Sequence, residues 1–334
     1  MDEPATSMRS GSAAARSRSN RASDSGSVID MAGLPVLVKG DDAAHIAAIE
    51  AVFGVTAICA DAPRAEITFG PGRLLPPERA PDVRVPDLDM WHDADMLTLA
   101  SEVHGVWARV SPTHAEIVGR TPPHERALRR IFHPVITHLL AHQGIFVIHA
   151  ASMRKGDRGV LALGESGKGK STMALAALLH DWRVMGDDLV ALSSAADAIL
   201  IRGLPKPLAL PTDLDPTLAD TIDGAAVITW DDRRRLHVPT DRLDLEEVEL
   251  GAILVVEHGD TARSSLEPTG SDLVTSWLMG SFTSVRDAPL MRRFFPVAAR
   301  AATVPRWVAR HGADPETRIA DAGRILAEVA TTWQ

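Results

Sequence analysis

The stretch Gly164-Glu165-Ser166-Gly167-Lys168-Gly169-Lys170-Ser171 matches the pattern G-x-x-x-x-G-K-[ST] of a phosphate-binding loop. The small and apolar residues 160–163 before it predict a strand, and the residues after it predict a helix over 171–179. Glycines let the loop backbone point several N–H groups at one anion, and the first helical turn adds its own N–H groups and the positive end of its dipole. The stretch therefore predicts a strand, a loop that binds the phosphates of a nucleoside triphosphate, and a helix.

Three side chains complete this prediction. Lys170 is expected to neutralise the β and γ phosphates, and the Ser171 hydroxyl to bind the Mg²⁺ that bridges phosphate oxygens. Thr172, the next residue, is grouped with the loop as nucleotide-binding. The predicted cofactors are ATP and Mg²⁺. A chance match on a Gly-rich loop is the alternative, and the flanking strand and helix weigh against it.

Two adjacent carboxylates, Asp187 and Asp188, follow Lys170 after one predicted helix and one predicted short strand over 183–185. A single crossover of this kind places them beside the phosphate loop. Neighbouring residues of a strand point to opposite faces unless a turn breaks the alternation, so one carboxylate could approach Mg²⁺ and the other an acceptor hydroxyl. We predict Ser171, Asp187 and Asp188 as metal-binding residues and the two aspartates also as catalytic. A solvated turn or a helix-capping pair is the alternative.

The composition limits the classes of function. The 334 residues carry 35 Lys and Arg against 44 Asp and Glu, a formal charge of −9, which argues against a protein built to bind nucleic acid. The single cysteine, Cys59, excludes an internal disulfide framework and a Cys-rich metal site. No secretory signal and no membrane span is recognisable. We therefore expect a cytoplasmic protein without a membrane or nucleic-acid partner.

The chain divides into three predicted parts. Residues 1–30, rich in Ser, Arg, Gly and Ala, predict a disordered tail,. Residues 31–122 predict a smaller α+β region. Its expected elements are strands over 34–39 and 66–69, a helix over 41–53, a loop over 71–86, and a hairpin of residues 103–110 and 114–118,.

Residues 123–334 form the third part, which alternates strands and helices in an α/β pattern. A helix over 123–142, kinked at Pro134, leads to a strand over 145–149. After the phosphate loop come strands over 189–192, 198–201, 226–229, 235–238 and 252–256, a helix over 272–282, and a last helix over 315–331 with Asp314 as its N-cap,. Four aromatic side chains are expected in the core: Trp277, Phe282, Phe294 and Phe295.

Four features together resemble the catalytic C-terminal domain of the HPr kinase/phosphorylase family. They are His149 on the strand before the loop, the loop itself, the Asp187-Asp188 pair after one helix, and the segment Ile201-Arg202-Gly203-Leu204. The resemblance covers about residues 145–210. It implies an α/β P-loop kinase domain of the HPr kinase type, a mixed sheet with flanking helices, behind the smaller N-terminal region.

The resemblance also implies an activity, a set of roles and an assembly. The activity is transfer of the γ-phosphoryl group of Mg-ATP to a serine of a protein or peptide. One member of Asp187-Asp188 would be the base, His149 would lie near the reacting phosphate, and Arg202 would hold or neutralise the transferred charge. That family forms hexamers, which implies a homo-oligomer.

The sequence departs from the family in two places. The family has an acidic residue directly before Ile-Arg-Gly-Leu, and this chain has Leu200 there. The segment 205–208 also differs from the family's continuation. These departures put phosphorylase activity and HPr as the acceptor in doubt, and the chain looks closer to related kinases of ribosomally made precursor peptides. Two other readings stay open. One is a nucleotide-binding regulatory module without catalysis, which Leu200 favours slightly, and the other is a small-molecule kinase.

Overall fold

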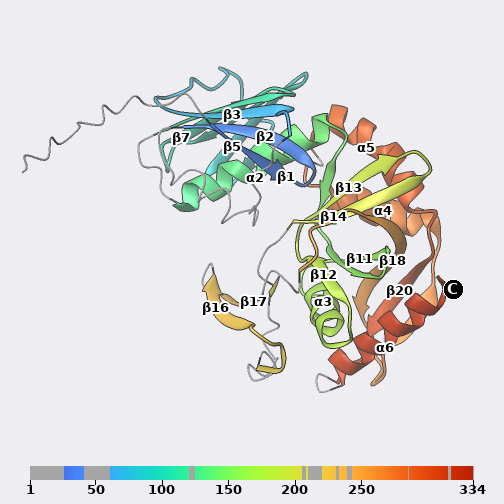
Figure 1. Ribbon diagram of the computed structural model, residues 1–334. Helices are drawn as coiled ribbons and strands as arrows, with labels where there is room; N and C mark the ends of the chain where they lie inside the picture. Colours follow the sequence, from blue (N-terminus) through green and yellow to red (C-terminus); the bar gives the residue numbers. More distant parts are fainter. Residues whose placement is uncertain are drawn as a thin grey trace, which may run out of the picture.

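The computed structural model describes residues 26–40, 61–119, 125–204, 208–209, 220–230, 233–238, 243–284, 286–314 and 317–333. The predicted helix over 41–53 and most of the predicted tail lie outside these ranges. Within them the chain is a mixed α/β protein (Figure 1). An N-terminal sheet lies beside a second, larger sheet that carries helices on both faces.

The N-terminal sheet has eight strands in the order β1-β2-β3-β8-β7-β6-β5-β4. They are β1 (Ser27–Met31), β2 (Leu34–Lys39), β3 (Ala65–Pro71), β4 (Val83–Val85), β5 (Leu88–Asp93), β6 (Met96–Ser101), β7 (Val106–Val110) and β8 (His114–Gly119). Alternate residues such as Val36, Val38 and Ile67 are buried, as expected for strands with one face on a core.

Helix α2 (Glu125–His142) covers one face of this sheet and contacts β6, β7 and β8. Its buried side chains recur at helical spacing, among them Ile131, Val135 and Leu139,. The helix also contacts β9 (Phe146–Ile148) of the second sheet, and one hydrophobic cluster joins the two. The predicted division of the chain at residue 123 stays a prediction, since α2 shares its core with both sheets.

The second sheet has nine strands and is built around β18 (Val248–His258). Its main path is β12-β10-β11-β18-β14-β13-β9, with β20 beside β18 and β19 beside β20. The further strands are β10 (Ala151–Lys155), β11 (Arg158–Leu163), β12 (Arg183–Gly186), β13 (Val190–Ala195), β14 (Ala198–Gly203), β19 (Ser265–Pro268) and β20 (Arg306–His311). Strands β11 and β20 run parallel to β18, and β14 runs antiparallel to it.

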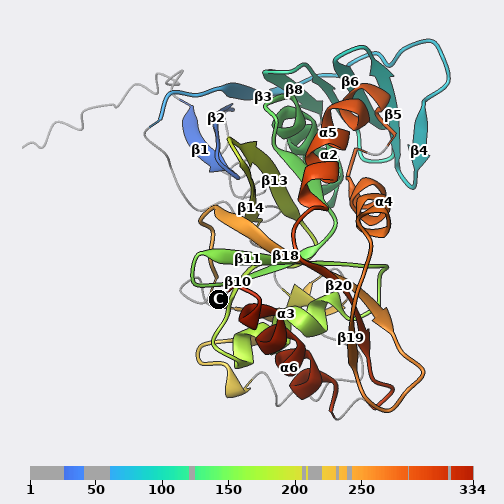
Figure 2. The ribbon, with the colours of Figure 1, turned by 90° about the vertical axis from the view of Figure 1, so that its right-hand side faces the viewer.

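Helices cover both faces of this sheet. Helices α3 (Lys170–Leu179) and α6 (Arg318–Thr331) pack together on one face, and α4 (Ser271–Ser281) and α5 (Ala288–Ala301) on the other, as Figure 2 shows. A three-stranded sheet of β15 (Leu208–Ala209), β17 (Arg233–His237) and β16 (Ala226–Trp230) lies at the side of α3 (Figure 1) and shares a hydrophobic cluster with it.

The structure corrects several predictions. Residues 27–30 belong to β1 and not to a tail, and the predicted loop over 71–86 contains β4. Helix α6 begins at Arg318 with Thr317 as its N-cap, so Asp314 is not the cap. Phe282 and Phe294 are buried as expected and Trp277 is partly buried, but Phe295 is 53% exposed because it lies on the outer side of α5. No helix in the described ranges is long and apolar enough to cross a bilayer.

Candidate nucleotide-binding site

The loop after β11 leads directly into α3, as predicted. Gly169 is the N-cap of the helix and has a left-handed backbone with φ of 107°, a conformation that favours glycine. Its carbonyl oxygen accepts the first helical hydrogen bond, from Met173 N at 3.0 Å. Glu165, Ser166 and Gly167 at the tip are exposed. The loop therefore presents its backbone to solvent at the positive end of α3.

Lys170 points back along this loop. Its side chain is 7% exposed, and Nζ donates hydrogen bonds to the carbonyl oxygens of Gly164 at 2.8 Å and Glu165 at 3.0 Å. Burial lowers the pKa of Lys170, while the charges of Asp187 and Asp188 act in the opposite direction. The ammonium group is thus held against the loop backbone. Thr172, in contrast, is buried within α3.

Asp187 lies directly beside the start of α3. Strand β12 ends at Gly186, and the chain bends at the next two residues. Asp187 is 3% exposed, and the Ser171 hydroxyl donates to its carboxylate at 2.9 and 3.1 Å. Two of the three residues predicted to bind metal, Ser171 and Asp187, therefore present oxygen atoms to one place at the end of the loop.

Asp188, the second residue of the bend after β12, contacts a different side chain. Its φ of 88° is unusual for a residue other than glycine, and such backbone conformations are concentrated at functional sites. Its Oδ1 lies 3.2 Å from Nδ1 of His149, and the two side chains are 32% and 44% exposed. The two aspartates are therefore divided between a buried contact with Ser171 and an accessible contact with a histidine.

His149 lies just after the end of β9. The prediction that it lies within the strand is therefore wrong by one residue. Its backbone N–H donates to the carbonyl of Ser281, the last residue of α4, at 2.7 Å. This hydrogen bond fixes the backbone that presents the imidazole to Asp188.

Arg202 is placed differently from its predicted role. Its Nη2 donates to Asp30 of β1 at 2.7 Å, so the guanidinium group links β14 to the N-terminal sheet. Within the described part of the chain, no hydrogen bond or ion pair joins Arg202 to the phosphate loop or to the Asp187-Asp188 bend. The predicted role of Arg202 in neutralising the transferred charge has no contact in its favour.

The neighbouring Gly203 has a steric reason to be glycine. A Cβ at this position would overlap the backbone carbonyl of Met185, so β14 can cross the end of β12 closely only without a side chain there. The crossing supports the backbone immediately before the two aspartates. The close packing of β14 on β12 therefore explains the glycine in the segment Ile201-Arg202-Gly203-Leu204.

Two histidines that sequence reasoning missed contact the loop backbone. His258 and His311 face each other at the ends of the parallel strands β18 and β20. Nε2 of His258 lies 2.9 Å from the carbonyl oxygen of Gly167, and Nε2 of His311 lies 3.3 Å from that of Gly169. His311 is fully buried, and its ring occupies the space that a side chain at Gly169 would need. Only the folded sheet brings these histidines to the loop, since they lie 91 and 142 residues away from it in sequence.

We expect His311→Phe to weaken nucleotide binding by about tenfold, because it removes one hydrogen bond to the loop while the volume of the ring is largely kept. Titration calorimetry with a non-hydrolysable ATP analogue and Mg²⁺ measures the affinity. His311→Gln, which can still donate a hydrogen bond, should restore part of the affinity, and replacement of the exposed His237 of β17, His237→Phe, should have no effect. Equal affinities for His311→Phe and the parent protein would show that this contact does not shape the loop.

Stability is expected to fall in mild acid. Burial lowers the pKa of His311 and of His138 to about 4 each. Below about pH 6.5 the unfolded chain binds protons at these histidines and the folded protein does not, so the free energy of unfolding should decrease as the pH falls from about 6.5 to 4, by up to about 1.4 kcal/mol per pH unit for each. Asp82, with its pKa lowered to about 2 chiefly by its hydrogen bond from Arg79, contributes a loss only below this window.

Urea unfolding at pH 7.5, 6 and 5 measures this dependence. The double variant His138→Gln/His311→Gln should show a flatter dependence on pH than the parent protein. The same slope in both proteins would assign the acid sensitivity to other groups.

No family model matches this sequence, and no curated protein matches it. Among solved structures, the HPr(Ser) kinase/phosphatase from Coxiella burnetii is similar over 56% of this chain and 99% of its own, with 15% identity and a TM-score of 0.29. A likeness at this level does not decide the activity of this protein, so a functional assignment depends on the chain's own residues.

Proposed function

We propose that this protein is a Mg-ATP-dependent kinase that transfers the γ-phosphoryl group to a serine of a protein or peptide. The observation that carries the proposal is that the two aspartates have different surroundings and different partners. Asp187 is buried against the Ser171 hydroxyl, and Asp188 is accessible beside His149. A kinase needs both a metal-binding group and a group that receives the proton of the acceptor.

The nucleotide would be held by the loop. The backbone N–H groups of residues 164–171 and the N-terminus of α3 favour phosphate oxygens, and Lys170 supplies a positive charge at the same place. His258 and His311 contact the carbonyl groups of Gly167 and Gly169 in the loop. Preorganisation of this kind lowers the cost of binding because less of the loop has to be ordered.

The Mg²⁺ fits the donors that are present. Ser171 and Asp187 offer a hydroxyl and a carboxylate, and magnesium is commonly bound by one or two protein oxygens together with phosphate oxygens and water. No group of three or more acidic, His or Cys side chains in the described ranges forms an all-protein metal site, which agrees with a metal shared with the nucleotide. Bound there, the ion would neutralise charge on the transferring phosphoryl group.

Asp188 would accept the proton of the serine hydroxyl as the serine oxygen bonds to the γ phosphorus. The bond from the γ phosphorus to the β–γ bridging oxygen breaks, which releases ADP and leaves phosphoserine, and the proton on Asp188 passes to solvent. His149, 3.2 Å from Asp188, would orient the carboxylate toward the acceptor.

The test is phosphate transfer from γ-labelled ATP to defined acceptors. A panel of serine-bearing peptides, including precursor peptides of ribosomally made products, is compared with HPr and with the same peptides carrying alanine for serine. We expect Mg²⁺-dependent label on serine in at least one peptide. Tight nucleotide binding without transfer to any acceptor would count against the proposal.

A second candidate is a nucleotide-binding module without catalysis. The observation that favours it is the ion pair of Arg202 with Asp30, which leaves the phosphate loop without that arginine. Such a module would bind ATP and ADP but would neither hydrolyse ATP nor label a peptide. The transfer assay therefore separates the two candidates.

A further inference from the structure

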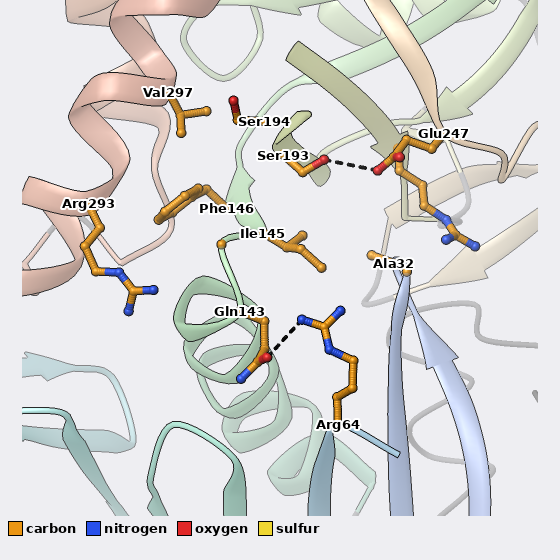
Figure 3. A pocket seen from close by; sticks show the side chains of 13 residues that line it. Ala32, Arg64, Gln143, Ile145, Phe146, Ser193, Ser194, Glu247, Arg293 and Val297 are labelled. Carbon is orange, nitrogen blue, oxygen red and sulfur yellow. Dashed lines mark hydrogen bonds between the residues drawn. The ribbon is translucent and has the colours of Figure 1, made fainter. Parts of the chain in front are cut away.

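A pocket of about 640 Å³ lies between the two sheets (Figure 3), and no residue of the phosphate loop lines it. Three parts of the chain form its wall: the β1–β2 turn and Arg64 on the N-terminal side, the segment between α2 and β9, and the outer parts of β13, β14 and α5. A volume of this size and a position between two structural units are typical of ligand sites.

The pocket collects guanidinium groups from three separate elements. Arg64 precedes β3, Arg202 lies on β14 and Arg293 lies on α5. The whole chain carries a formal charge of −9. A cluster of three arginines is therefore a local positive charge on a protein that is negative overall, and such a cluster attracts anions.

Two of these arginines have neutral partners. Arg64 donates to the side-chain oxygen of Gln143 at 3.1 Å, and Arg293 donates to the carbonyl of His142 at 3.0 Å and contacts its ring nitrogen at 3.2 Å. Among the residues that the structure describes, neither has a carboxylate within 4.0 Å. Each keeps further N–H donors, since a guanidinium group has five. Figure 3 shows the guanidinium group of Arg64 pointing into the space between Gln143 and Ala32.

The other charged groups of the pocket do not pair with Arg64 or Arg293. Arg202 is already paired with Asp30. Glu247 accepts a hydrogen bond from Ser193 at 3.1 Å, and Figure 3 shows it across the pocket from Arg293. Ile145, Phe146 and Val297 add apolar surface. A ligand with carboxylates and some apolar surface complements this lining, because arginine binds carboxylates through paired hydrogen bonds.

The pocket reaches the strand that follows the proposed base. Ser193 lines the pocket and lies on β13, five residues after Asp188, which stands in the bend before that strand. At about 3.3 Å per residue the two residues are at most roughly 17 Å apart. An extended peptide has nearly the same rise per residue, so a peptide whose serine reaches Asp188 would place residues about five positions away at the pocket.

We propose that this arginine pocket binds an acidic segment of the peptide acceptor, about five residues from the serine that receives the phosphoryl group. The inference about the acceptor rests on the kinase function proposed above, but the binding of an acidic peptide can be measured without any transfer.

The binding test uses a fluorescein-labelled peptide with three consecutive glutamates five residues from an alanine that replaces the serine. Fluorescence anisotropy should show binding that weakens as salt is raised. Arg64→Gln/Arg293→Gln should lose about tenfold or more in affinity. The control Arg292→Gln changes a neighbouring exposed arginine of α5 outside the pocket and should bind as the parent does. No binding to the parent, or equal binding to the double variant, would overturn the inference.

A second measurement separates this inference from the proposed function. Asp188→Asn should bind the acidic peptide as tightly as the parent, because Asp188 does not line the pocket. With serine in place of alanine, the parent should phosphorylate the five-residue spacing faster than spacings of one or ten residues. If the peptide binds but no phosphate is transferred, the acidic-peptide site is supported and the kinase function is refuted. If transfer occurs at a rate that depends neither on the glutamates nor on Arg64 and Arg293, the kinase function is supported and the role of the pocket is refuted.

Discussion

Asp188→Asn should lower the rate of phosphoryl transfer by about 10²–10⁴-fold, the range expected when a general base is lost, while the affinity for Mg-nucleotide stays close to that of the parent. Asparagine tolerates the positive φ of 88° at this position,, so the bend and the Ser171–Asp187 contact should persist. Single-turnover kinetics with labelled ATP and a saturating acceptor measures the rate, and calorimetry measures the affinity.

The matched control for this prediction is Asp181→Asn. Asp181 is also an aspartate with positive φ, 59°, and it is exposed in the turn after α3. It should transfer phosphate at the rate of the parent protein. Transfer by Asp188→Asn at that same rate would mean that Asp188 is not the base.

Asp187→Asn should remove the dependence of nucleotide binding on Mg²⁺ and abolish detectable transfer. The amide oxygen can still accept the hydrogen bond of Ser171, but the negative charge that would hold the metal is gone,. We expect an affinity loss of about 10–100-fold in Mg²⁺. In excess chelator, the variant should bind ATP as the parent does, because only the metal-dependent part is affected.

Asp244→Asn provides the control for a buried aspartate. Asp244 is nearly as buried as Asp187, but it pairs with Arg154 at 3.1 Å. Its replacement should lower the melting temperature without changing the effect of Mg²⁺ on ATP binding. If Asp187→Asn behaved like Asp244→Asn, with lower stability and unchanged Mg²⁺ dependence, the metal-binding role of Asp187 would be refuted.

Local sequence was enough to predict the strand, the loop and the helix that contain the proposed phosphate-binding residues. The strand, the glycines, Lys170 and the helix lie within about twenty consecutive residues, and their physics is local. The proximity of Asp187 to Ser171 could be predicted as well, since only one helix and one short strand separate them. Which aspartate contacts Ser171 could not be predicted, because both lie in a bend outside β12, where the alternation of a strand does not apply,.

The missed parts of the site depend on distant segments. His258 and His311 reach the loop only because β18 and β20 pair in parallel with their last residues aligned. Arg202 is held by Asp30, 172 residues away in sequence, and no local pattern signals that contact. Helix α5, which contains Pro296, was not among the predicted elements, although α2, which contains Pro134, was predicted from its apolar spacing,.

The most direct test of the central claim is a crystal structure with Mg²⁺ and a non-hydrolysable ATP analogue. We predict the triphosphate within the backbone of residues 164–171, Mg²⁺ bound by Ser171 and held by Asp187 directly or through water, and the Asp188 carboxylate open toward the γ phosphate. A nucleotide bound elsewhere on the protein, or a metal held without Ser171 and Asp187, would contradict the account.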